Sequence, residues 1–164
     1  MLGLASQRTR TAEGLAGVLQ HAVPDATITV TEFHPVWIRL NQFEPTALGE
    51  NCVLGRGFYD RGNCARVVIR PTTPESVLGL TPGREVHAEI TALLRFYLGY
   101  EANAHLEMHV ATELMPKAEL SSDQVRLGYT TQLAQPDLPY ATGAITRVQL
   151  GTWDGRTANT HTTH

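Results

Sequence analysis

Histidine and carboxylate side chains alternate in one segment of the chain, His105-Leu106-Glu107-Met108-His109. In a β-strand, residues two apart point to the same face, so the two imidazoles and the carboxylate would lie together. Two histidines and one glutamate are a common set of metal ligands. The pattern therefore suggests one functional hypothesis: a small metal-assisted enzyme that uses His105, Glu107 and His109, with His87 nearby.

The spacing of a strand argues against that hypothesis. Same-face residues two apart are separated by about 7 Å, so His105 and His109 would be about 13 Å apart. Metal–ligand bonds of about 2 Å cannot bridge this distance. The simpler interpretation is that Leu106, Met108 and Val110 face the core while the polar side chains face water. We therefore predict no metal site, no cofactor and no catalytic residue.

No other segment carries a complete catalytic motif. His87-Ala88-Glu89 begins a zinc deaminase signature, but the Pro-Cys-x-x-Cys that the signature requires is absent. The sequence contains no P-loop, no Gly-x-Ser-x-Gly and no His-Glu-x-x-His. Asp60, followed by Arg61-Gly62, fits a turn better than a carboxylate site. Cys52 and Cys64 are expected to be reduced thiols, and two cysteines alone make no zinc site.

Composition narrows the class of protein further. The 164 residues, 42% of them hydrophobic, suffice for one soluble domain with a core. Thirteen basic and sixteen acidic residues give a net charge of −3, which argues against a protein that binds nucleic acid or a membrane surface. No stretch approaches the roughly 20 apolar residues of a membrane span, and the N-terminus does not resemble a signal peptide. We therefore expect no direct membrane insertion.

Hydrophobic periodicity predicts both helices and strands. Apolar residues at helical spacing predict helices over 12–22, capped by Thr11, and over 83–98, ended by Gly99, and Thr73 is expected to cap a short helix to residue 78. Alternation and β-branched residues predict strands over 27–33, 36–40, 65–70, 102–112, 124–132 and 144–150. Helices and strands do not alternate strictly, which favours an α+β fold: one mixed domain with a mainly antiparallel sheet and about three helices.

The segment from Asn41 to Asn63 is a long, glycine-rich connection that we expect to be irregular, with short extended pieces. Loops of this length in small domains are more often functional than idle. Aromatic residues in or beside this segment either pack a loop against the core or bind a partner chain. The candidate partner-binding residues of the whole chain are Trp37, Phe43, Leu54, Phe58, Tyr59, Tyr129 and Leu133. We predict an α+β domain over 1–135, an extended link with a C-terminal strand over 136–156, and a disordered tail over 157–164.

Six segments between about Ser6 and Ala134 occur in an order that is fairly specific. They are Ala5–Leu15, Phe33 with Trp37, the Leu-Gly pairs at 48–49 and 54–55 with Tyr59-Asp60, Arg66–Pro71, Leu80–Gly83 with Leu93–Gly99, and Leu127–Leu133. Together they resemble the C-terminal half of TssG, the baseplate wedge subunit of type VI secretion systems. The chain departs from the family pattern at Arg70, Gln132 and Ala134, which stand in place of glycine, tryptophan and glycine.

The resemblance implies a structural role in a contractile injection machine, at a cytoplasmic baseplate close to the membrane. TssG-like proteins pair with two copies of TssF, and their loops grip TssK trimers. TssE joins the same wedge. The family has no catalytic residues to carry over, so the resemblance also implies that this chain is not an enzyme.

Overall fold

The central feature of the fold is a four-stranded sheet. The computed structural model describes residues 11–39, 55–99, 102–116, 125–131 and 143–154. The strands lie in the order β1-β4-β5-β6, where β1 is Ala26–Thr31, β4 Cys64–Pro71, β5 Asn103–Ala111 and β6 Ile145–Trp153. The outer pairs β1/β4 and β5/β6 are antiparallel, whereas β4 and β5 are parallel. The expected α+β class with a mainly antiparallel sheet is confirmed.

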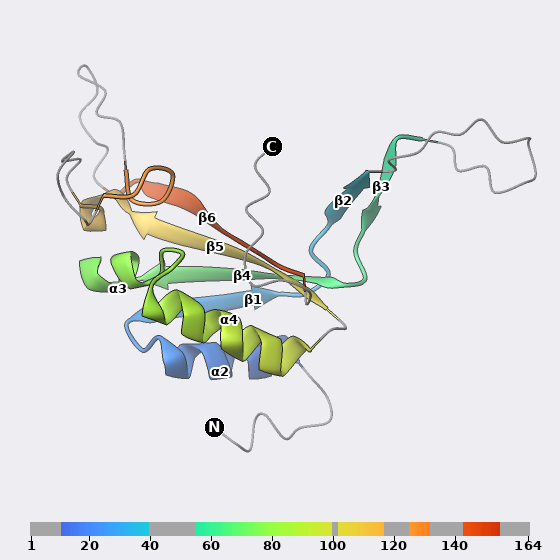
Figure 1. Cartoon of the computed structure of the whole chain (residues 1–164), viewed down its shortest axis with the longest axis horizontal. Coiled ribbons are helices and arrows are strands. Elements are labelled where there is room, and N and C mark those ends of the chain that lie inside the picture. The colour runs from blue at the N-terminus through green and yellow to red at the C-terminus, as the bar shows by residue number, and fades with distance from the viewer. Residues whose placement is uncertain (1–10, 40–54, 100–101, 117–124, 132–142, 155–164) are drawn as a thin grey trace, which may run out of the picture.

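Two helices cover one face of this sheet, as Figure 1 shows: α2 (Ala12–Ala22) and α4 (Glu85–Leu98). A short helix, α3 (Pro74–Gly79), precedes α4, and the two helices form the crossover that a parallel strand pair requires. The alternating inward residues of the strands meet the apolar stripes of the helices. The side chains that are fully buried in this core include Leu15, Leu19, Val67, Ile69, Val77, Leu80, Ile90, Leu94, Met108 and Val110.

Local signals position the helices where the sequence predicts them. The Thr11 side chain accepts a hydrogen bond from the Gly14 N–H and caps α2. Thr73 and Ser76 form a reciprocal capping box at the start of α3. Gly99 ends α4 with φ 62°, a region that residues with a Cβ rarely adopt. The expected helices over 12–22 and to residue 78 are thus confirmed, and the third begins at Glu85 instead of Gly83.

A second, two-stranded sheet extends away from the first (Figure 1). It consists of β2 (Val36–Arg39) and β3 (Gly57–Asp60), which pair antiparallel and which we call the arm. The chain leaves the main sheet after β1 and returns at β4, so the arm is inserted between two paired strands. The neck of this insertion is closed by a hydrogen bond of 2.8 Å that His34 N–H donates to the Cys64 carbonyl.

The prediction of a strand over 124–132 is wrong within the residues described there. Residues 127–130 form a turn, in which the Thr130 hydroxyl accepts the Arg126 N–H and the Thr130 N–H reaches back to the Arg126 carbonyl. Gly128 has φ 85°, which is incompatible with a strand. The β-branched run that indicated a strand, Thr130-Thr131, therefore lies in and directly after this turn.

The C-terminal strand predicted over 144–150 is confirmed as β6, which extends to Trp153 and completes the main sheet beside β5. A single-turn 3-10 helix, η1 (Thr112–Leu114), follows β5. The predicted division at residue 135 and the tail over 157–164 stay predictions, and the tail lies outside the described residues. Among the described helices, none is both long and apolar enough to cross a membrane.

Candidate partner-binding site

The arm exposes apolar side chains on both of its faces. Trp37 lies directly opposite Tyr59, and their rings meet edge to face with centroids 4.9 Å apart. Ile38 lies opposite Phe58 on the other face. Trp37 is 48% exposed, Phe58 50% and Tyr59 63%. Of the nine large hydrophobic residues exposed in the described part of the chain, five belong to this short ribbon.

The Trp37 ring is seated on Gly57. A Cβ at Gly57 would meet the Ile38 carbonyl and would lie only 2.7–2.8 Å from atoms of the indole ring. Only glycine fits at position 57, because the Trp37 ring and the backbone of β2 lie too close for a side chain. The sequence alone assigns this role to no particular glycine of the segment. This contact with Gly57 fixes the orientation of the Trp37 side chain.

A two-stranded ribbon with both faces in water is marginally stable on its own. The arm nevertheless keeps aromatic and aliphatic side chains on each face, although exposed apolar surface is normally confined to interaction sites when it is contiguous. Tryptophan, tyrosine and arginine are also the residues that most often dominate binding energy at interfaces, and Arg39 completes that set on β2. The exposed residues of the arm thus have the composition that is typical of protein interfaces.

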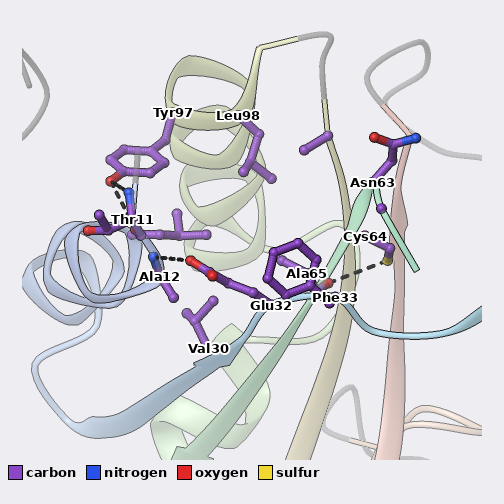
Figure 2. A pocket seen from close by; sticks show the side chains of 13 residues that line it. Thr11, Ala12, Val30, Glu32, Phe33, Asn63, Cys64, Ala65, Tyr97 and Leu98 are labelled. Atoms are coloured by element: carbon purple, nitrogen blue, oxygen red, sulfur yellow. Dashed lines mark hydrogen bonds between the residues drawn. The ribbon is translucent and has the colours of Figure 1, made fainter. Parts of the chain in front are cut away.

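The root of the arm borders a cavity of about 280 Å³ (Figure 2). Its walls come from the start of α2, the end of β1, the start of β4 and the end of α4. Figure 2 shows two contacts that fix the start of α2: the Tyr97 hydroxyl contacts the Thr11 backbone, and the Glu32 carboxylate accepts the Ala12 N–H at 2.9 Å. Phe33, at the rim, is 64% exposed and has φ 59°. Such a backbone conformation is rare for a bulky residue and typical of functional sites.

The cluster that suggested metal chemistry has a different arrangement from the one expected. His105, Glu107 and His109 share one face of β5, as predicted, but Glu107 is buried, at 7% exposure. The expectation that this polar set faces water is therefore wrong for Glu107. A residue from the neighbouring strand compensates the buried charge: the Arg66 guanidinium donates to the Glu107 carboxylate at 2.6 Å.

The Arg66–Glu107 ion pair lowers the pKa of Glu107, whereas burial has the largest effect on the pKa of His105. Arg66, and secondarily the hydrogen bond with His109, hold the pKa of Glu107 below its ordinary value. Burial lowers the pKa of His105, although the Glu107 carboxylate opposes that effect. His105 also stacks on His34 at the neck of the arm, with ring centroids 5.6 Å apart. In the described part of the chain, no group of three or more His, Cys, Asp or Glu could hold a metal ion. The metal-enzyme hypothesis thus has no support in this geometry.

Two other chemical candidates are accounted for by packing. The Asp60 carboxylate accepts the Gly62 N–H at 2.8 Å, which is the turn predicted from its sequence context. Cys64 is a free, buried thiol whose pKa is raised by burial. Cys52 lies outside the described residues.

The structure brings three of the seven predicted partner-binding residues together, Trp37, Phe58 and Tyr59, on the arm. Tyr129 is half-buried and packs against the main core, far along the chain from them. Phe43, Leu54 and Leu133 lie outside the described residues. Sequence reasoning did not include Leu127, which is 86% exposed in the turn beside Tyr129. The binding role of all seven stays a prediction.

Comparisons with known proteins agree with this fold. A family model described as "Type VI secretion, TssG" matches residues 1–134. No curated protein matches the chain. One chain in the cryo-electron microscopy structure of the type VI secretion system TssK-TssF-TssG baseplate subcomplex has a TM-score of 0.75 and 24% identity, over 98% of this chain and 69% of that chain. A chain in a structure of the baseplate complex from the type VI secretion system has a TM-score of 0.64 and 24% identity, over 92% of this chain and 44% of that chain.

Proposed function

Because the chain belongs to the TssG family of type VI secretion proteins, we propose that it is a structural subunit of the secretion baseplate. Within the wedge it bridges TssF and TssK, with two copies of TssF, contacts to TssK trimers, and TssE as a further neighbour. It carries out no catalysis and works in the cytoplasm at the membrane-proximal end of the apparatus. The observation that carries this proposal is the family match over residues 1–134.

The fold adds independent support. Both solved structures that resemble the chain are baseplate assemblies, and one of them contains TssK, TssF and TssG together. A bridging subunit needs a rigid body and at least one separate contact surface. The main sheet with its helices provides the body, and the arm provides an exposed apolar ribbon outside it.

We assign the TssK contact to the arm. The resemblance implies that loops of the family grip TssK, and the two strands of the arm flank the glycine-rich segment of the sequence. Trp37 is its expected anchor, because its ring is held in place by Gly57 and by Tyr59 yet remains about half exposed. Anchors of this kind cost about 2 kcal/mol or more when truncated.

The test combines co-purification with affinity measurement. TssF and TssK from the same operon are purified with the chain, and binding to TssK is measured by biolayer interferometry. Trp37→Ala should weaken TssK binding about 30-fold, which corresponds to about 2 kcal/mol, and should leave TssF binding unchanged. The control is Phe96→Ala, which removes an aromatic ring of similar exposure, 64%, from the outer face of α4.

Two outcomes would contradict different parts of the proposal. If the unaltered chain binds neither TssF nor TssK, the baseplate function is wrong. If it binds both and Trp37→Ala has no larger effect than Phe96→Ala, the function stands and the assignment of TssK to the arm is wrong.

A further inference from the structure

The face of the main sheet opposite α2 and α4 carries an ordered set of polar side chains. The strand registers align them in rows across the sheet. One row runs Thr31, Arg66, His105, Thr152, and the next runs Thr29, Val68, Glu107, Gln149. The third contains Thr27 paired with Arg70, and His109 paired with Arg147. Ile69 pairs with Met108 in the parallel pairing of β4 with β5. The next residues on the two strands, Arg70 and His109, therefore also lie side by side.

Positive charge dominates this face although the whole chain has a net charge of −3. Among the described strands, this face holds three arginines, Arg66, Arg70 and Arg147, against one carboxylate, Glu107. That carboxylate is already paired with Arg66. Arg70 and Arg147 are exposed, and within the described ranges neither side chain makes a hydrogen bond or an ion pair. We call Arg70, His109 and Arg147 the basic row.

The basic row has the dimensions of a carboxylate-binding surface. Arg70 is on β4 and Arg147 on β6, two strands apart, so their backbones are separated by about 10 Å. An arginine side chain is long enough for both guanidinium groups to reach one acidic group, or two neighbouring ones, above His109. Arginine pairs with carboxylates through two parallel hydrogen bonds, which supplies orientation as well as attraction.

We propose that this sheet face binds an acidic, extended segment of a partner protein, with Arg70 and Arg147 as its main contacts. Charge complementarity identifies the occupant. The threonines of β1 and the Gln149 amide offer neutral hydrogen-bonding groups along the same face, as a peptide requires. Arg70 and Arg147 form one local pair of exposed positive charges, whereas a nucleic-acid backbone needs a continuous positive field.

This surface is distinct from the arm, so the inference goes beyond the proposed contact with TssK. The arm is joined to the sheet at the ends of β1 and β4 next to Thr31 and Cys64. Arg70 lies near the opposite end of β4, and its neighbour Pro71 pairs with the first residue of β1. A partner segment on the basic row can therefore be bound while the arm is occupied.

The probe for this proposal is a fluorescein-labelled peptide of ten glutamates, with a ten-lysine peptide as its counterpart. Binding to the full chain is followed by fluorescence anisotropy at about 20 mM salt, where exposed charge pairs are only weakly screened. The variant Arg70→Gln/Arg147→Gln should bind the glutamate peptide about tenfold more weakly, since each exposed pair contributes about threefold. The matched control Arg95→Gln removes another exposed arginine, from α4 on the other side of the sheet, and should change binding less than twofold.

The competing occupants are outcomes of the same experiment. No measurable binding of the glutamate peptide to the unaltered chain would overturn the proposal, as would an equal loss in the Arg95→Gln control or no loss in the double variant. Tighter binding of a labelled ten-nucleotide single strand, with the same dependence on Arg70 and Arg147, would also overturn it in favour of nucleic acid. Circular dichroism of both variants verifies that the comparison is made on folded protein.

Discussion

Replacing Glu107 with glutamine tests the assignment of this residue as a buried ion-pair partner. The side chain is nearly isosteric, so packing is preserved while the negative charge is lost. Arg66 then keeps its charge in a place where its own side chain is only 30% exposed. Glutamine can accept one hydrogen bond from Arg66, but it no longer neutralises the guanidinium.

The magnitude follows from the contacts. Hydrogen bonds to charged groups contribute roughly 1.5–3 kcal/mol each, and Glu107 makes one to Arg66 at 2.6 Å and one to His109 at 3.2 Å. Arg66 retains some access to water, which reduces the loss from the value for a fully buried pair. We expect Glu107→Gln to lower the free energy of unfolding by about 2 kcal/mol at pH 7.

The pH dependence provides the sharper readout. The folded pKa of Glu107 lies below the ordinary value of 4.5, so its stabilisation is fully present above pH 4.5 and is lost as the pH falls through the folded pKa. Urea unfolding followed by circular dichroism at pH 7 and at pH 3.5 should therefore show a large difference between wild type and Glu107→Gln at pH 7 and a smaller one at pH 3.5.

Two further variants complete the design. Glu89→Gln removes an exposed carboxylate from α4 and should change stability by less than about 0.5 kcal/mol. The double variant Arg66→Gln/Glu107→Gln should be destabilised by less than the sum of the single variants, because removing both partners leaves no unpaired charge. Additive single effects, or a difference between wild type and Glu107→Gln that is as large at pH 3.5 as at pH 7, would refute the reasoning.

Two more predictions concern the neck of the arm and the start of α2. Burial lowers the pKa of His105 below the ordinary 6.5, so the unfolded chain binds the extra proton first and stability is lost as the pH falls below 6.5. His105→Gln should lose less stability than wild type between pH 7.5 and 5.5 in urea titrations, whereas His21→Gln, an exposed control on α2, should follow wild type. Tyr97→Phe removes a hydroxyl that bonds both the Thr11 carbonyl and the Thr11 N–H, at 3.0 and 3.1 Å. It should lower the unfolding free energy by about 1–2 kcal/mol, and an effect no larger than that of Tyr59→Phe, whose ring is exposed, would contradict that role.

The sequence predicts the elements whose signals are local. The helix over 12–22 combines a capping threonine with apolar residues at helical spacing, and both act within a few residues of each other. β5 is likewise predicted in full, because alternation along one strand decides which side chains enter the core. These patterns require no knowledge of distant segments.

What sequence reasoning missed depends on distant residues or on backbone conformation. Glu107 is buried and pairs with Arg66, 41 positions earlier, and strand alternation alone does not indicate whether a polar face is covered. The turn over 127–130 depends on the positive φ of Gly128, which outweighed the β-propensity of the threonines beside it. The pairing of β2 with β3 was hidden because the glycine-rich segment between them has no regular period.

The same distinction between local sequence signals and contacts of distant residues applies to the partner-binding candidates. The sequence placed Trp37, Phe58 and Tyr59 in or beside one irregular segment, and the structure brings these three residues together on the arm. Gly57 was not identified, because its importance arises only from the ring that packs on it. The basic row was also not visible in the sequence, since Arg70, His109 and Arg147 become neighbours only through the registers of three strands.

The insertion of the arm between β1 and β4 makes it an exchangeable part of the protein. The sheet closes beneath it through the Thr31–Arg66 pairing and the hydrogen bond from His34 to Cys64, so the arm contributes no strand to the main core. Doubling the length of such a loop costs only about 0.6 kcal/mol of closure entropy. Arms of different length and sequence can therefore evolve, or be grafted, on one unchanged body.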